Sequence, residues 1–401
     1  MKPTLKTALT CLLLIVSGQL LAQNITYPKF GSGIRFVAAD SSGSIQMNAR
    51  IQNLFIAEQA LGEDFDPALN ALTRRVRLKF GGFAFDPRFT YKIEIGLSNR
   101  DTRYRDDGSL VGNTARLVMD AVVKYEFLKG HQIWFGQTKL PGNRERVISS
   151  QKLQFVDRSL LNSRFNIDRD FGVQFRHKFK LGDARLIFAE AISLGEGRNY
   201  INTDAGGLEY TGRVEFLPMG SFTSKGDYVS SDLSREETPK LSIGVTGDYN
   251  VGAIRSGGQL GKILIDTTGA YVESDLLSLM ADMMFKYKGW SVLIETAYRE
   301  SSLGDFRDAN GNAYRQGFAY SGQAGYLFEN NLELAGRYTR TMKLSGLASD
   351  VGNVEQYTLG LSRYFLGHNV KVQTDLTYER GLSTTFADEN LIFRFQTELS
   401  F

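Results

Sequence analysis

The chain has 401 residues, and its 47 lysines and arginines nearly balance its 44 aspartates and glutamates. Because the two signs nearly balance, the chain has no overall positive field that would favour nucleic acid as a partner. There is one cysteine, Cys11, so the chain lacks the pairs or clusters that disulfides and thiolate metal sites require.

Residues 1–22 have the layout of a secretory signal peptide. Lys2 and Lys6 lie near the start, an apolar run covers residues 12–16, and Ala22 is a small residue at the expected cleavage point. A buried helix of a soluble protein is the alternative for such a run. Removal of this segment takes away the cysteine and both lysines, which leaves a mature net charge of about +1. We therefore expect an exported chain.

Alternation of apolar and polar residues recurs along the rest of the chain and predicts β-strands. In one example, Val76, Leu78 and Phe80 alternate with Arg75 and Arg77. Clear alternation covers 75–85, 89–97, 117–127, 171–179, 208–216, 277–287, 290–298, 318–328, 332–338, 370–378 and 391–401. Weaker candidates are 45–55, 131–139, 184–193, 241–249 and 354–365. Each of these segments is near the ~9–11 residues that a tilted strand needs to cross a bilayer.

The connections between these strands fall into two groups. Tight turns are expected at 86–87, 128–130, 181–182, 288–289, 329–330 and 367–368. Longer polar loops are expected at 57–73, 101–115, 140–170, 194–206, 251–275, 302–315, 342–353 and 381–390. Short periplasmic turns opposite long extracellular loops are typical of outer-membrane barrels, whereas a secreted β-sandwich does not need this arrangement. One connection, 217–239, should be a short turn and instead reads as an insertion on the periplasmic side.

The last strand favours a closed barrel. Leu391, Phe393 and Phe395 share one face, and the chain ends in Phe401, as in the sorting signal of bacterial outer-membrane proteins. We expect the outer-membrane insertion machinery to recognise this strand. Its expected partner is the strand at 45–55, and this pairing would leave no open edge in lipid.

The sequence therefore predicts an all-β protein, a 16-stranded antiparallel transmembrane β-barrel of a Gram-negative outer membrane. The barrel would cover residues 43–401, after an N-terminal periplasmic segment at 23–42. Aromatic residues near strand ends, such as Phe85, Tyr125 and Trp290, match an interfacial girdle in contact with membrane lipid and lipopolysaccharide.

The connection 140–170 combines apolar anchors with many charges. It lacks sustained alternation, and a loop of this length in a compact domain is usually functional or disordered. Its apolar side chains include Ile148, Leu153, Phe155 and Phe165, which a solvated linker would lack. We expect it to be a constriction loop that folds into the barrel and narrows the channel.

Several motifs resemble the phosphate-selective porin O/P family of Gram-negative bacteria. They are RRVRLKFGG at 74–82, DP at 86–87, FGQTKLP at 135–141 and DRDFG at 168–172. The resemblance implies a barrel of 16 strands, commonly a homotrimer, whose third long loop folds into the lumen. It also implies a ladder of arginines and lysines that draws anions to the constriction, and the pair Arg74 and Arg75 matches such a motif.

The phase of the strands assigns charged side chains to the lumen. The inward face of the first six strands holds nine basic and three acidic residues, and that of the clearer later strands holds six and nine. We expect the basic wall to lie nearest the constriction loop, with the acidic wall opposite. The candidate anion-binding and pore-lining residues are Arg74, Arg75, Arg77, Lys79, Lys92, Lys124, Arg144, Arg146, Lys152, Arg158, Arg164, Arg169 and Arg176.

Guanidinium groups bind phosphate or carboxylate oxygens through paired donors, so these residues favour oxyanions. We expect passive diffusion of small hydrophilic solutes with a preference for anions such as phosphate. In the alternative, the opposed charges only create a transverse field, and the channel is non-selective or of the oligosaccharide type.

Catalysis has little support. His131 and His368 lie near tight turns, His177 lies in a strand, and none has a serine beside it in a nucleophile arrangement. We expect no enzymatic activity, no cofactor and no metal. A barrel hydrolase and a secreted β-scaffold are the less favoured alternatives.

Overall fold

The computed structural model describes residues 23–26, 29–102, 117–199, 206–382 and 389–401. The predicted signal peptide, 1–22, lies outside these ranges, as do parts of the loops predicted at 101–115, 194–206 and 381–390. Within the described ranges most residues are in β-strands, and no helix there is long and apolar enough to cross a membrane.

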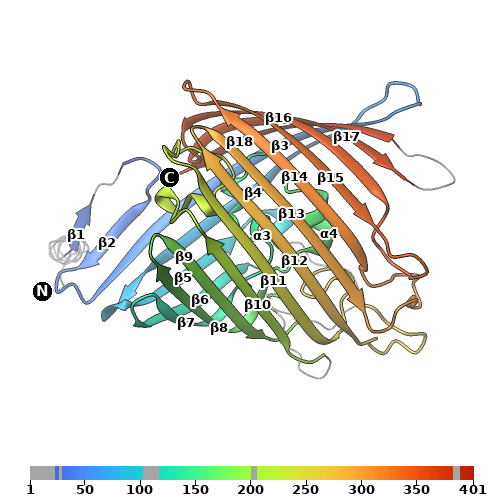
Figure 1. Cartoon of the computed structure of the whole chain (residues 1–401), viewed down its shortest axis with the longest axis horizontal. Helices are drawn as coiled ribbons and strands as arrows, with labels where there is room; N and C mark the ends of the chain where they lie inside the picture. Colours follow the sequence, from blue (N-terminus) through green and yellow to red (C-terminus); the bar gives the residue numbers. More distant parts are fainter. Residues whose placement is uncertain (1–22, 27–28, 103–116, 200–205, 383–388) are drawn as a thin grey trace, which may run out of the picture.

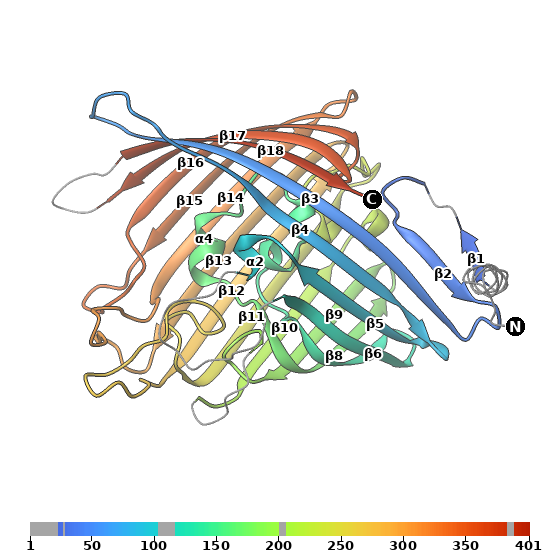
Figure 2. The same cartoon turned by 180° about the vertical axis from the view of Figure 1, so that it is seen from behind.

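Sixteen antiparallel strands form a closed barrel (Figures 1 and 2). They are β3 (Gly43–Ala60), β4 (Ala68–Ala84), β5 (Asp86–Gly96), β6 (Val118–Leu128), β7 (His131–Lys139), β8 (Arg169–Leu181), β9 (Ala184–Ser193), β10 (Glu209–Leu217), β11 (Lys240–Ala253), β12 (Ser274–Tyr287), β13 (Trp290–Ser301), β14 (Gly317–Leu327), β15 (Leu332–Met342), β16 (Val354–Leu366), β17 (Val370–Gly381) and β18 (Glu389–Ser400). The barrel closes where β18 pairs with β3, from Asn390 opposite Ala60 to Ser400 opposite Arg50. The predicted fold class is confirmed.

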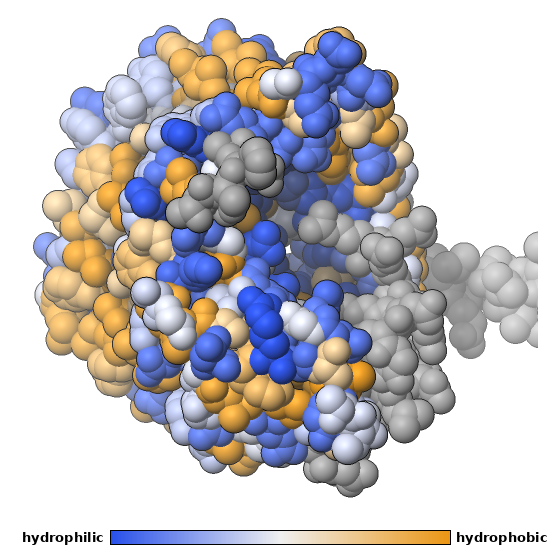
Figure 3. All heavy atoms as spheres, turned by 90° about the vertical axis from the view of Figure 1, so that its right-hand side faces the viewer, coloured by the Kyte–Doolittle hydropathy of each residue, from blue (hydrophilic) through white to orange (hydrophobic). Residues whose placement is uncertain are grey.

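The strands place apolar side chains outward and polar side chains inward. In β10, for example, Tyr210, Val214 and Phe216 are exposed, while Thr211 and Arg213 are buried. An apolar exterior suits lipid, because the ladder of inter-strand hydrogen bonds already satisfies the backbone. Figure 3 looks into the end of the barrel that carries the long loops, and hydrophilic residues dominate the hollow there.

The predicted loop at 57–73 is wrong, because most of it is strand. β3 and β4 stay paired as far as Glu58 opposite Ala68, so their hairpin projects beyond the neighbouring strands (Figure 1). Both faces of a projecting hairpin meet solvent, and Phe65 at its tip is 86% exposed. With no buried face to select apolar residues, the alternation that marks a strand is lost there.

The N-terminal segment adds two short strands beside the barrel. β1 (Gln23–Thr26) pairs with β2 (Ile34–Ala38), and β2 pairs with the beginning of β3. Because β3 begins before its pairing with β18, its first residues extend the wall beyond the C-terminal strand. This extension lies at the end of the barrel that carries the short turns (Figure 2).

Two connections fold into the barrel. The first joins β7 to β8 and contains the short helices α3 (Arg144–Val147), η2 (Ser150–Lys152) and α4 (Leu160–Phe165). We call residues 140–168 the inward loop. The second, residues 218–239 between β10 and β11, contains η3 (Thr223–Tyr228). Outside these two connections, the four-residue helix α2 (Asn99–Thr102) follows β5 at the long-loop end.

Candidate functional site

The inward loop packs one apolar face against the barrel wall. Leu161, Phe165 and Ile167 form a buried cluster with Met280 and Ala297 of β12 and β13. A second cluster joins Ile148 and Leu153 of the loop to Met284 and Leu293 of the same strands. Burial of each large apolar side chain contributes about 1.5–3 kcal/mol relative to its exposed state, so these clusters fix the loop to this side of the lumen.

Polar contacts attach the same face of the loop to acidic residues of the wall. Carboxylates of β12, β13, β15 and β17 each accept a hydrogen bond from the loop. The contacts are Arg144 Nε to Asp282 Oδ1 (2.6 Å), the Glu145 backbone N–H to Glu295 Oε1 (2.7 Å), Gln154 Nε2 to Glu333 Oε1 (2.8 Å) and the Val156 backbone N–H to Asp375 Oδ2 (3.0 Å). These carboxylates are buried, and the loop supplies donors for them.

This arrangement corrects the predicted placement of the two walls. The inward loop lies against the acidic wall, not the basic one. The physical reason is that buried carboxylates need donors, and the loop provides backbone N–H groups and Arg144 for them. The basic wall is left facing the open side of the lumen.

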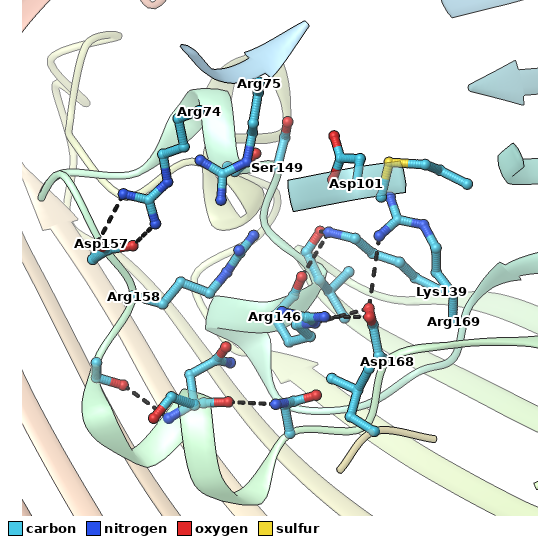
Figure 4. A pocket seen from close by; sticks show the side chains of 18 of the residues that line it. Arg74, Arg75, Asp101, Lys139, Arg146, Ser149, Asp157, Arg158, Asp168 and Arg169 are labelled. Atoms are coloured by element: carbon cyan, nitrogen blue, oxygen red, sulfur yellow. Dashed lines mark hydrogen bonds and ion pairs between the residues drawn. The ribbon is translucent and has the colours of Figure 1, made fainter. Parts of the chain in front are cut away.

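A cavity of about 670 Å³ remains between the loop and the basic wall. Figure 4 shows side chains of β4, β7 and the loop converging on it. Among the described residues, its lining contains 12 lysines and arginines and four aspartates and glutamates. The cations are Arg74, Arg75, Arg77, Lys79, Lys92, Lys139, Arg146, Arg158, Arg169, Arg198, Arg337 and Arg394, and the carboxylates are Glu94, Asp101, Asp157 and Asp168.

Some of these cations form ion pairs within the lining or just behind it. Arg77 Nη1 lies 3.0 Å from Glu94 Oε1, and its Nη2 lies 2.9 Å from Asp101 Oδ1. Lys92 and Arg169 both contact Asp120, at 2.7 and 3.1 Å. Arg74 pairs with Asp157, and Arg146 with Asp168 (Figure 4). These pairs hold the basic groups in place and offset part of their charge.

Several cations of the lining, among them Arg75, Arg158 and Lys139, contact neutral acceptors instead. Arg75 donates to the side-chain oxygen of Gln52. Arg158 donates to the carbonyls of Glu145 (2.8 Å) and Ile148 (2.7 Å). Lys139 Nζ donates to three loop carbonyls, those of residues 146, 147 and 148, at 2.6 to 3.2 Å. Within the described part of the chain, none of the three has a carboxylate within 4.0 Å, so no ion pair offsets their charge.

The local field acts on the titration of loop residues. Burial, followed by the charge of Arg146, holds the pKa of Arg158 below its ordinary value. Burial alone would raise the pKa of Asp168, but Arg146 and Arg169 hold it well below its usual range. The shift of Asp168 opposes the effect of burial and therefore has the sign of a positive potential, which an incoming anion would relieve.

The structure brings eight of the predicted site residues to the cavity. These are Arg74, Arg75, Arg77, Lys79, Lys92, Arg146, Arg158 and Arg169. Arg144 does not line it, because its guanidinium is fully buried against Asp282. Lys124 and Arg176 lie over the ring of Trp134, at 3.7 and 4.1 Å from its centroid, and Lys152 and Arg164 are likewise not part of the lining.

Four lining cations were not among the predicted site residues. Lys139 belongs to the segment 135–141, one of the motifs behind the family resemblance, and that was a usable signal. Arg337 and Arg394 are on the inward face of their strands, and closure of β18 onto β3 brings Arg394 round to the arginines of β4. Arg198 lies in a connection without regular pattern, and no sequence signal pointed to it.

A family model described as phosphate-selective porin O and P matches residues 45–239. Over these residues the chain is similar to the phosphate-selective porin O and P family. The match covers β3 to β10, most of the basic wall and the whole inward loop, and it confirms the resemblance seen in the sequence. No curated protein sequence matches the chain.

Solved porin structures share the barrel. The outer membrane channel DcaP of Acinetobacter baumannii is 12% identical, with a TM-score of 0.54 over 90% of this chain and 98% of its own. An anion-selective porin from Comamonas acidovorans is also 12% identical, with a TM-score of 0.54 over 90% of this chain and 100% of its own. OprB of Pseudomonas putida is 10% identical, with a TM-score of 0.52 over 89% of this chain and 94% of its own. At such identities the likeness concerns the fold. Together with the family match, it supports an outer-membrane channel for small solutes.

Proposed function

We propose that this porin lets small anions, phosphate or similar oxyanions, diffuse through the cavity beside the inward loop. The observation that carries the proposal is the composition of the lining, with 12 cations against four carboxylates. The whole chain has nearly equal numbers of basic and acidic residues, so the excess of positive charge is local to the cavity. A low-dielectric wall strengthens the resulting potential and raises the concentration of anions at the cavity.

The lining cations that form no ion pair give an anion a series of weak contacts. Arg75 and Arg158 present donors that now meet only neutral oxygens, and Lys139 adds its charge behind them. One charge-assisted hydrogen bond contributes about 1.5–3 kcal/mol, which holds an oxyanion only briefly. Several such positions in sequence allow entry and release, as conduction requires. The same donors fit phosphate, sulfate and carboxylates, so the substrate class is small oxyanions.

The anion-selective porin from Comamonas acidovorans supports this preference as a property of a similar barrel. A further neighbour, OmpT of Vibrio cholerae, is described in a trimer form and is 11% identical, with a TM-score of 0.50 over 89% of this chain and 99% of its own. On this basis we propose a homotrimer. From the sequence pattern we further propose a signal peptide at 1–22, a periplasmic location for 23–42 and delivery to the membrane by the insertion machinery through β18. Lipid and lipopolysaccharide would contact the apolar exterior.

The test is the reversal potential of single channels in a planar bilayer under a salt gradient. The current through the native channel is expected to reverse at a potential whose sign shows that anions carry most of the current. Arg75→Glu places a carboxylate among the lining cations and should move the reversal potential toward that of a cation channel. Arg88→Glu is the matched control, because Arg88 is exposed, contacts Asp86 and lies at the short-turn end outside the cavity.

Added phosphate should also reduce the chloride current of the native channel more than that of Arg75→Glu. A native channel that reverses near zero, or equal shifts in both variants, would refute the proposed selectivity. A non-selective or oligosaccharide channel would then be the better description.

A further inference from the structure

The connection 218–239 departs from the other turns at its end of the barrel. In the neighbouring hairpin, for example, β12 and β13 are joined by Lys288 and Gly289 alone. The longer connection folds back into the lumen, and part of it becomes buried there (yellow-green in Figure 1). Ser231 and Asp232 have no exposed surface, and Ser230 and Glu236 are only 2% and 3% exposed.

This connection spans the opening from β10 as far as β16. Side chains of its central part reach the ends of three other hairpins. The contacts are the Gly289 backbone N–H to Asp232 Oδ2 (2.8 Å), Arg235 Nη1 to the Leu327 carbonyl (2.8 Å), Ser231 Oγ to Glu333 Oε2 (2.7 Å) and Ser231 Oγ to the Tyr364 hydroxyl (2.6 Å). The segment is thus tied to the far side of the barrel.

The same segment contacts the inward loop from the short-turn end of the barrel and supports it there. The Ser230 backbone N–H donates to the Lys152 carbonyl at 3.0 Å, and Arg144 Nη1 donates to the Asp227 carbonyl at 3.0 Å. Phe222 is part of the buried cluster that contains Ile148 and Leu153 of the loop. These backbone, charged and apolar contacts together fasten the two segments to each other.

The cavity lies on the other side of the inward loop. Its lining, as far as the structure describes it, includes no residue of β9 to β14 and none of 218–239. Among the described residues, the half of the lumen next to these strands is therefore largely filled by the loop and the connection. The space left there, beside Arg176, Arg213 and Tyr228, is only about 10 Å³, against about 670 Å³ in the cavity that faces the basic wall.

We propose that residues 218–239 form a plug at the short-turn end, which supports the inward loop and confines the solute path to the basic wall. This inference rests on the proposed function, because it concerns how the anion path is kept separate from the acidic wall. Without the plug, a second path would open past Asp282, Glu295 and the other carboxylates that now hold the loop. The plug would therefore determine both the width and the selectivity of the channel.

The experiment replaces residues 218–241 with Asn-Gly. This removes both prolines of the connection and continues the register of Phe216 opposite Ile243 into a two-residue hairpin turn of the kind that strand twist favours. Single-channel conductance should rise, and the reversal potential should shift toward zero. The matched control shortens the exposed β3–β4 hairpin by replacing residues 59–67 with the same turn, which keeps Glu58 opposite Ala68, and both quantities should stay at native values. Heat-modifiable gel mobility checks that each variant forms the barrel.

A second variant covers the case in which the excised chain fails to fold. Asp232→Ala removes the acceptor for the Gly289 and Glu236 backbone N–H groups and should loosen the plug in place. It should raise the conductance in the same direction. It should also speed thiol modification of a cysteine introduced at Lys152, whose carbonyl contacts the plug.

The outcomes separate the two proposals. Native conductance and native reversal potential in a folded excision variant, or in Asp232→Ala when excision does not fold, would overturn the plug. A native channel without anion preference would refute the proposed function alone, and a conductance increase on excision would still support the plug.

Discussion

Arg144→Met is expected to release the inward loop while the barrel stays intact. The guanidinium is fully buried and contacts Asp282 Oδ1 (2.6 Å), Ser242 Oγ (2.8 Å) and the Asp227 carbonyl (3.0 Å). Breaking a buried ion pair typically costs about 3–5 kcal/mol. Asp282 keeps a second cation, Arg213, whose Nη1 lies 2.6 Å from Oδ2, so the lower end applies. A loss of about 3 kcal/mol raises the population of the released loop by roughly 100-fold or more.

Thiol modification measures this release. A cysteine in place of Leu161, which has no exposed surface, should react only when the loop leaves the wall. Its modification rate should be roughly 100-fold higher in the Arg144→Met background, because local opening limits access. The barrel ladder does not involve Arg144, so heat-modifiable gel mobility should not change. An unchanged rate, or loss of the folded band, would show that Arg144 does not act as a fastener of the loop.

Two further predictions concern the loop packing and pH. Phe165→Ala should destabilise the attached loop by about 3–5 kcal/mol, the usual cost of truncating a buried aromatic, and increase current noise; Ser163→Ala, at an exposed position, is the control. Burial raises the pKa of Glu196 to about 7, above its ordinary value of 4.5. The contribution of Glu196 to the free energy of unfolding is therefore fully present below pH 4.5 and is lost as the pH rises through about 7. In Glu196→Gln the dependence of thermal stability on pH should be flatter over this interval. An unchanged pH profile would contradict the assignment.

The barrel could be predicted because its determinants are local. Alternation along each strand reports which face meets lipid, and the chain repeats this pattern in every segment of the wall. The prediction was wrong where that constraint ends, at the β3–β4 hairpin, because a strand outside the membrane with two solvated faces has no reason to alternate. The inward loop was likewise visible from its apolar anchors, since Ile148, Leu153 and Phe165 do pack inside.

The contacts of the inward loop could not be predicted from these patterns. Arg144 and Asp282 are 138 residues apart in the chain, and the phase of a strand gives the face of a side chain without naming its partner. The connection 218–239 stood out by its length, but its role depends on contacts to Lys152, Gly289 and Glu333, which are remote in sequence. Such contacts are fixed by the closed barrel as a whole.

A tally of inward charges is therefore a poor guide to the charge that a solute meets. A lumenal carboxylate can face water and repel anions, or it can accept hydrogen bonds from a loop and leave the solute path. Here Asp282, Glu295 and Asp375 accept hydrogen bonds from the loop, because a buried carboxylate without donors would be costly. The loop covers the acidic wall and leaves the basic wall open. A chain with 47 basic and 44 acidic residues can in this way present a cavity in which cations outnumber carboxylates 12 to four.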